Sequence, residues 1–188
     1  TPFDTPARAA TNIMDAVAVA ADGATADNPG VCHIEPGTYT AANAFDATKT
    51  HLIILDVPVR LVGNGASPDA VVIDGLQQRR LVSVTHGGAT VENLTLHRAG
   101  GLSGSGTLGF GVHLTAGMVT NCVVSSGRMS QTGTAEPYVY VRGSGKVFDT
   151  TIRGLTDTSG TWSSSSAACQ VDGSGAMIGC VITNNTCG

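Results

Sequence analysis

Residues 89–96 (ATVENLTL) decide the fold, because the chain repeats their pattern three more times without gaps. The three repeats are residues 117–124 (GMVTNCVV), 145–152 (GKVFDTTI) and 175–182 (GAMIGCVI). The third residues of the four segments lie 28, 28 and 30 residues apart, and they are Val91, Val119, Val147 and Met177. A period in this range is typical of a solenoid, in which each unit buries its apolar face against its neighbours.

Each repeat is predicted to form two short strands joined at a bend. Alternation of period two places Val91 and Leu96 on the inner face and Glu92 on the outer face. The bend residues are of types that tolerate unusual backbone angles, and they are Asn93, Asn121, Asp149 and Gly179. We expect the first three to form a side-chain ladder along the solenoid axis.

A third strand is predicted before each repeat. These strands are residues 81–84, 111–114, 138–141 and 168–171. Earlier coils are predicted from residues 31–35, 59–63 and 71–75. Three strands per coil predict an all-β, right-handed parallel β-helix of five to six coils.

A capping helix is predicted before the first coil. Asn12 and Asp15 resemble a capping box, and Ile13, Val17 and Ala20 mark one helical face. Such a helix would cover the core side chains and unpaired strand edges of the first coil. We therefore expect one domain, residues 1–188, with residues 1–30 as the cap and 31–188 as the coils.

Composition limits the classes of partner. The chain has 188 residues, ten Lys and Arg against 14 Asp and Glu, and basic residues that are scattered except for Arg79 and Arg80. No nucleic-acid partner is expected. No apolar run reaches the roughly 20 residues that cross a bilayer, so membrane insertion is not expected. The chain begins at Thr1, so either a signal peptide has been removed or the chain is an excised piece; we favour export, to the extracellular space or the cell surface.

One succession of segments resembles a known family. It comprises residues 12–17, 33–39, 59–63, 72–75 and 91–96. This succession is similar to the N-terminal part of the pectin-lyase-fold, right-handed β-helix proteins of bacterial surfaces and secretions. The resemblance implies the fold but not one activity, because the family includes polysaccharide lyases, glycoside hydrolases, esterases, adhesins and inert stalks.

The cysteines favour a structural role. Cys32, Cys122, Cys169 and Cys180 occupy inward positions, where thiols serve as small apolar fillers. Cys187 lies outside the repeat and could form a disulfide with Cys169 or Cys180 in an oxidising compartment. No pair of cysteines has the spacing of a zinc site, so no metal is expected.

Enzymatic candidates are few. The family resemblance implies that a lyase would need a calcium-binding acidic cluster and a basic residue, whereas Asp74, Glu92 and Asp149 lie in different coils and strand positions. Arg98 and Arg153 lie just after Leu96 and Ile152 and could face a uronate, or could be ordinary surface arginines. Calcium is therefore expected only if the protein is a lyase. No outward row supplies the two carboxylates of a glycosidase.

Apolar residues at outward positions indicate a contact surface. They are Phe148, Ile178, Val123 and Val181, which align with Glu or Thr in other coils. They predict a face for another protein, or cover by residues 131–137 and 156–167. Trp162, in a Thr/Ser-rich loop, could contact a glycan or pack on its own loop.

Two functional hypotheses follow. We favour a non-catalytic extracellular structural or adhesion module that binds neighbouring surface proteins or further copies of itself, end to end, in a filament. The expectation rests on the short segment after Ile182, which could not cover the last coil. The alternative is a carbohydrate-active enzyme, similar to a polysaccharide lyase or hydrolase, or a fragment of one, that acts on acidic polysaccharide.

Overall fold

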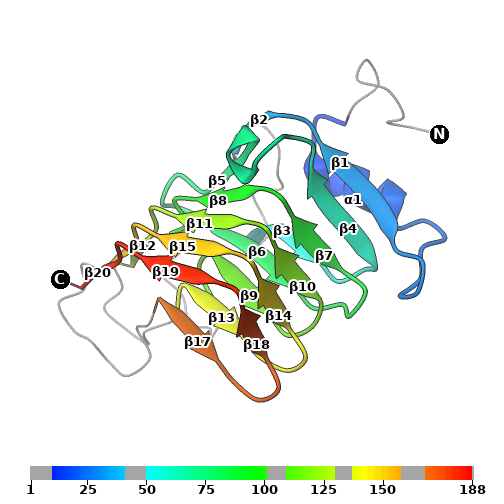
Figure 1. The fold of residues 1–188 in the computed structure, drawn as a ribbon. Coiled ribbons are helices and arrows are strands. Elements are labelled where there is room, and N and C mark those ends of the chain that lie inside the picture. The colour runs from blue at the N-terminus through cyan, green and yellow to red at the C-terminus, as the bar shows by residue number, and fades with distance from the viewer. Residues whose placement is uncertain (1–9, 41–49, 101–108, 130–136, 158–167, 188) are drawn as a thin grey trace.

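The computed structural model describes residues 10–40, 50–100, 109–129, 137–157 and 168–187. The chain forms an all-β parallel β-solenoid with one short helix near its start (Figure 1). Successive strands pass from one sheet to the next, and each coil returns to the first sheet one strand further along the axis. The predicted fold class is confirmed.

Sheet A contains six parallel strands, and its register tests the repeat. Its strands are β1 (Gly30–Ile34), β4 (Val59–Gly63), β7 (Thr90–Glu92), β10 (Met118–Thr120), β14 (Lys146–Phe148) and β18 (Ala176–Ile178). Val119 pairs with Val91 on one side and with Val147 on the other, and Val147 pairs with Met177. The predicted period is therefore the register of the sheet.

Sheets B and C complete each coil. Sheet B contains β2 (Gly37–Thr40), β5 (Val71–Asp74), β8 (Thr95–His97), β11 (Val123–Ser125), β15 (Thr151–Arg153) and β19 (Val181–Thr183). Sheet C contains β3 (His51–Leu55), β6 (Arg80–Val84), β9 (Val112–Leu114), β13 (Val139–Val141) and β17 (Cys169–Val171). A 3₁₀-helix, Pro68–Ala70, precedes β5. Each end of the predicted strands lies within one residue of the corresponding observed end.

A short fourth sheet was not predicted. Sheet D contains β12 (Arg128–Met129), β16 (Thr156–Asp157) and β20 (Thr186–Cys187). Four coils, which begin at β4, β7, β10 and β14, have a neighbour on each side in sheets A and B. Counted in this way the solenoid has about four enclosed turns, slightly fewer than the five to six coils expected, which included both ends.

The corner between sheets A and B has left-handed backbone, as its residue types predicted. The φ angles of Asn93, Asn121 and Asp149 are 56°, 46° and 44°. Asn121 Nδ2 donates to Asn93 Oδ1 at 3.1 Å, and Asn93 Nδ2 donates to the carbonyl oxygen of Gly63 at 2.9 Å. Side chains therefore connect three successive coils at this corner.

The helix α1 (Ile13–Ala20) covers the first coil. Asn12 accepts a hydrogen bond from the Met14 N–H at 2.8 Å, which satisfies one free donor at the helix start. Ile13 and Val17 are buried, and the helix packs against β1, β3 and β4. The predicted cap is confirmed. In the described part of the chain, no helix combines the length and the hydropathy needed to span a membrane.

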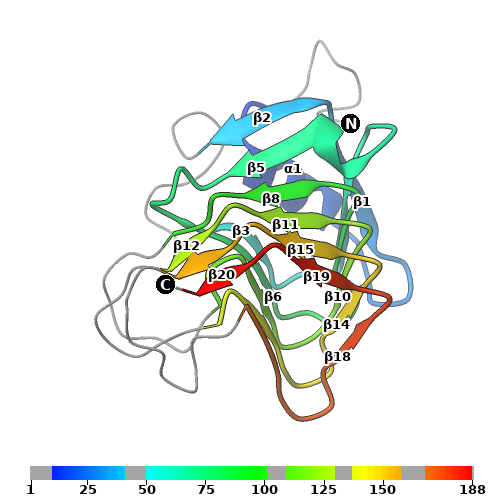
Figure 2. The same cartoon turned by 60° about the vertical axis from the view of Figure 1, so that its left-hand side comes forward.

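The last coil has no such cover among the described residues. Ile152, on the inner face of β15, is 0% exposed, whereas its register partner Ile182 on β19 is 54% exposed. In sheet C, Val141 is 0% exposed and its partner Val171 is 43% exposed. We call the inward-facing surface of β17, β18 and β19 the open end (Figures 1 and 2).

Candidate functional site

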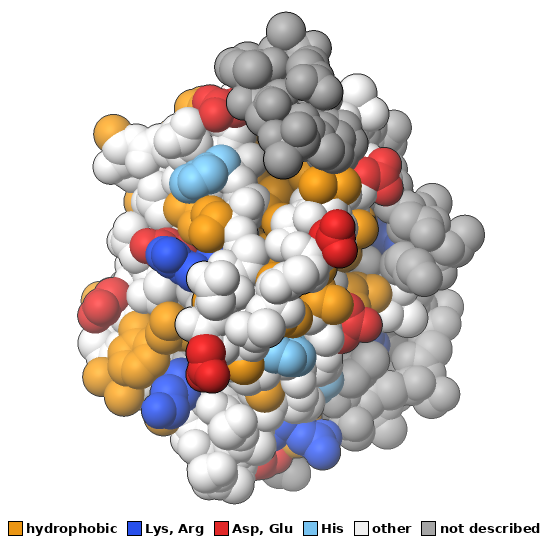
Figure 3. All heavy atoms as spheres, turned by 90° about the vertical axis from the view of Figure 1, so that its right-hand side faces the viewer, with side chains coloured by type: hydrophobic (Ala, Val, Ile, Leu, Met, Phe, Trp, Pro, Cys, Tyr) orange, Lys and Arg blue, Asp and Glu red, His pale blue; other side chains and the backbone are white. Residues whose placement is uncertain are grey.

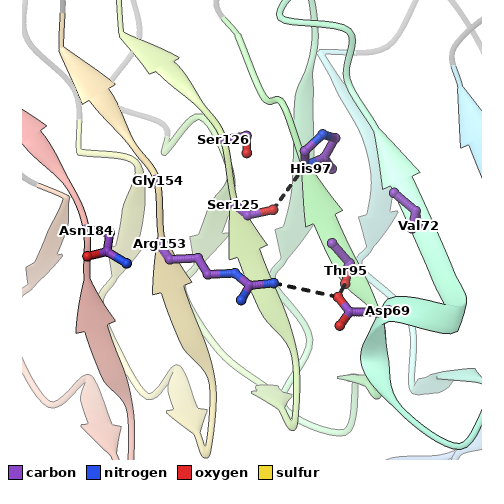
Figure 4. Close-up of a pocket in the computed structure, with 9 residues that line it drawn as sticks. All are labelled: Asp69, Val72, Thr95, His97, Ser125, Ser126, Arg153, Gly154 and Asn184. Carbon is purple, nitrogen blue, oxygen red and sulfur yellow. Dashed lines mark hydrogen bonds and ion pairs between the residues drawn. The ribbon is translucent and has the colours of Figure 1, made fainter.

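A groove of about 390 Å³ crosses the outer face of sheet B (Figure 4). Side chains from β5, β8, β11 and β15 form its floor, because alternate residues of each strand point outward. The groove walls include Asp69 from the 3₁₀-helix and Asn184, which follows β19. The site is therefore built from successive coils rather than from one loop.

One polar row runs through this region with one residue per coil. The register pairs Asp74 with His97, His97 with Ser125, and Ser125 with Arg153. Sequence reasoning missed this row, although His97, Ser125 and Arg153 are spaced by the 28-residue period of the repeat. Extending the repeat by one residue past 96, 124 and 152 would have found these three residues but not Asp74, where the period differs.

Ser125 and His97 contact each other inside the groove. The Ser125 Oγ lies 3.0 Å from the His97 Nδ1, and Ser125 is buried while His97 is half-buried. Burial lowers the pKa of His97, the nearby Asp74 carboxylate opposes this, and the Arg98 guanidinium lowers it further. The imidazole is therefore neutral near pH 7 and able to accept a proton.

Arg98 is bound to Asp74 and does not line the groove. Its Nε donates to Asp74 Oδ1 at 3.0 Å, and its Nη2 also contacts Oδ2. Burial would raise the pKa of the Asp74 carboxyl, but the Arg98 guanidinium and the Leu76 N–H outweigh it and lower that pKa. The two candidate arginines therefore do not share one binding surface.

Arg153 is the predicted arginine that lines the groove. Its Nη2 lies 3.9 Å from Asp69 Oδ1, and both side chains are at least half exposed. Thr95 Oγ1 lies 3.2 Å from the same Asp69 oxygen and donates to the carbonyl oxygen of Pro68 at 3.1 Å. An exposed pair at this distance is weak, so Arg153 can turn toward an anionic ligand.

The predicted apolar contact residues lie on two outer faces near the open end. Phe148 is half-buried and pairs with Ile178, which is exposed. Val123 is half-buried, and Thr151 separates it from the exposed Val181. On the face that carries β1 and β4, hydrophobic side chains form small groups between polar ones (Figure 3). Trp162 lies outside the described residues.

The thiols occupy the predicted inward positions in part. Cys32 and Cys122 are buried, and burial raises the pKa of the Cys122 thiol to about 12. Cys169 and Cys180 are half-buried at the open end. The side chain of Cys187 lies outside the described residues, so its disulfide with Cys169 or Cys180 stays a prediction.

A second polar cluster lies on the outer face of sheet C. His113 is buried on β9 between Ser83 and Tyr140 of the neighbouring strands. Its ring stacks 6.3 Å from that of the buried His51. Burial lowers the pKa of His113 to about 4, and the charges of Arg142 and Arg80 contribute to this shift. Burial lowers the pKa of His51 to about 3, and Arg80 and His113 contribute.

Side chains that could bind a metal are dispersed. Within the described ranges, no three His, Cys, Asp or Glu side chains gather closely enough to hold a metal ion. Calcium therefore stays a prediction tied to the lyase alternative.

Comparisons with protein families, curated proteins and solved structures found no match.

Proposed function

We propose that the protein is an extracellular structural or adhesion module, of the pectin-lyase-fold type, in which two copies associate through their open ends. One observation carries the proposal: Ile182 is 54% exposed at a position that is 0% exposed in the preceding coil. Ile182, Val171 and Met177 belong to rows that are buried in the interior coils, so they present a core surface to solvent.

Both parts of this surface favour association with further strands. Removing one large aliphatic side chain such as Ile182 from water contributes roughly 1.5 to 3 kcal/mol when the burial is complete. Among the described residues, no further strand pairs with the outer edges of β18 and β19 in sheets A and B, so backbone groups there lack a strand partner. An unpaired edge of this kind is a template for another chain.

The covered first coil favours a pair of copies over the filament considered from the sequence. A head-to-tail filament needs an open surface at each end, and α1 already covers β1. Two open ends related by a two-fold axis use the same surface twice and close the assembly. A filament would require α1 to leave the first coil.

Light scattering at increasing protein concentration tests this proposal. The wild-type mass should rise to that of a dimer, and Ile182→Lys should remain a monomer because it places a charge in the joint. Val31→Lys is the matched control, since Val31 is a 45% exposed valine on β1 at the other end. A wild-type monomer at every concentration would contradict the proposal, as would equal masses for the two variants.

The second candidate is an enzyme that acts on acidic polysaccharide, and Arg153 in the groove favours it. Among the described residues that line the groove, Asp69 is the one carboxylate, so these residues do not form a glycosidase pair. A lyase would release unsaturated uronate that absorbs in the ultraviolet. Arg153→Ala should abolish this product with pectate or alginate and calcium, whereas Arg60→Ala, on sheet A, should not.

A further inference from the structure

We propose that Ser125 is the nucleophile, and His97 the general base, of an ester-hydrolysing site in the groove on the outer face of sheet B. This activity goes beyond the assembly proposed above and does not depend on it. The open end is formed by inward-facing side chains, whereas both catalytic side chains point outward from β8 and β11 (Figure 4).

The first argument is the distance between the two side chains. A nucleophile and its base must lie within hydrogen-bond reach, about 2.6 to 3.2 Å. The Ser125 Oγ and the His97 Nδ1 are 3.0 Å apart, and both residues line the groove. Parallel pairing of β8 with β11 fixes the two backbones opposite each other, so the pair is held by the sheet.

The second argument is the order of charges along the row. His97 stands between Asp74 and Ser125 in register, and the Asp74 carboxylate favours the protonated imidazole that forms during the reaction. Asp74 is itself held ionised by Arg98 and the Leu76 N–H. Asp74 is therefore a positioning residue that acts through His97.

The third argument is the cation on the other side of the nucleophile. Arg153 pairs with Ser125 in the next coil, and its guanidinium lines the same groove. Its weak, exposed contact with Asp69 leaves it able to reach a developing oxyanion. Positive charge at that position stabilises the tetrahedral intermediate more than the uncharged ester.

The reaction proceeds in two balanced steps. The Ser125 Oγ forms a bond to the ester carbonyl carbon while its proton passes to the His97 Nδ1, and the carbonyl oxygen becomes an oxyanion beside Arg153. The intermediate collapses, the carbon–oxygen bond to the alcohol breaks, and the alcohol leaves with the proton from His97. Water then attacks the acyl-enzyme with His97 again as base, which releases the carboxylic acid and restores Ser125.

The groove suits an ester of a polar alcohol. Thr95 and Asn184 supply hydrogen-bonding groups along the groove, and Val72 adds an aliphatic side chain. The open groove can hold the alcohol portion of an ester through these hydrogen-bonding groups.

Labelling with a fluorophosphonate probe, followed by peptide mass spectrometry, tests the proposal on the full chain. The wild type should carry the adduct on Ser125, and Ser125→Ala should carry none. Hydrolysis of p-nitrophenyl acetate should fall about 100-fold or more in Ser125→Ala and in His97→Gln, the usual range for loss of a catalytic base. Ser67→Ala is the control, because Ser67 is exposed and its side chain makes no capping hydrogen bond.

The rate of labelling against pH separates catalysis from a structural hydrogen bond. The wild-type rate should fall at acid pH as His97 becomes protonated, and Asp74→Asn should shift that midpoint to lower pH while Ser125 stays labelled. Absence of the adduct on Ser125 would overturn the proposal. So would labelling of the folded His97→Gln variant at the wild-type rate.

Discussion

The first and last coils of this solenoid carry the same inner-face pattern but differ in what lies over them. The helix α1 packs over β1, with Ile13 and Val17 buried in the contact. At the other end, Ile182 and Val171 repeat buried positions of the preceding coil and are about half exposed. Burial in a solenoid thus depends on the neighbouring layer as much as on the residue, because each unit contacts only its neighbours.

The largest expected effect is a difference in stability loss when equivalent cysteines of an interior coil and of the last coil are replaced. Cys122 and Cys180 both follow the bend residue of their repeats, but Cys122 is buried and Cys180 is half-buried. Cys122→Asp should lower the free energy of unfolding by about 3 to 5 kcal/mol, because an unpaired carboxyl is buried. Cys180→Asp should cost much less. Urea denaturation measures both.

Cys122→Val is the control for the size of the side chain, and it should be mild. Equal and small losses for Cys122→Asp and Cys180→Asp would break the comparison, since both positions would then be open to solvent.

Acid should lower the free energy of unfolding, because two buried histidines must take up protons. The folded-state pKa values of His51 and His113 are about 3 and about 4, below the ordinary value of 6.5. Below about pH 6.5 the unfolded chain binds protons that the folded chain excludes, so stability falls as pH decreases toward these folded values. The loss by pH 4 should be on the order of 3 kcal/mol for each of the two histidines.

Denaturation at a series of pH values measures this loss, with two matched variants. His113→Gln should lessen the decline between pH 6.5 and 4, and the remainder should come from His51. His33→Gln should leave it unchanged, because His33 is exposed on β1. If stability fell with pH as steeply in His113→Gln as in the wild type, groups other than His113 would be responsible for the fall.

A smaller effect is expected at the corners. Asn93 has a φ of 56° and donates hydrogen bonds to the carbonyl oxygens of Gly63 and Gly65. Asn93→Ala should cost about 1 to 2 kcal/mol through strain and lost hydrogen bonds. Asn184 near the open end has a similar φ of 54° and is exposed, so Asn184→Ala should cost less. Thermal unfolding of both variants compares them, and an equal cost would attribute the effect to strain alone.

The repeat could be predicted because periodicity acts along the whole chain. The inner row of Val91, Val119 and Val147 and the corner at Asn93 and Asn121 follow from residue type and spacing. Each is set by local alternation and by contact with the next coil. These are the interactions that a sequence pattern encodes.

The outer faces could not be predicted in the same way. His113 is buried because it packs with His51, Ser83 and Tyr140 from other coils, whereas His33, which also points outward but on β1 of sheet A, is exposed. A second corner of each coil also has left-handed backbone, and residue type does not reveal it. The residues at this corner are Arg98, Ser126, Gly154 and Asn184. This corner turns Arg98 toward Asp74 and leaves Arg153 in the groove.

Hydrogen exchange at several protein concentrations tests the difference between the two ends most directly. Exchange of residues 176–183 in the open end should slow as concentration rises, because association protects the edges of β18 and β19. Exchange of residues 30–34 in β1, near α1, should not change. Exchange that is independent of concentration at both ends, or protection that grows only at β1, would contradict association through the open end.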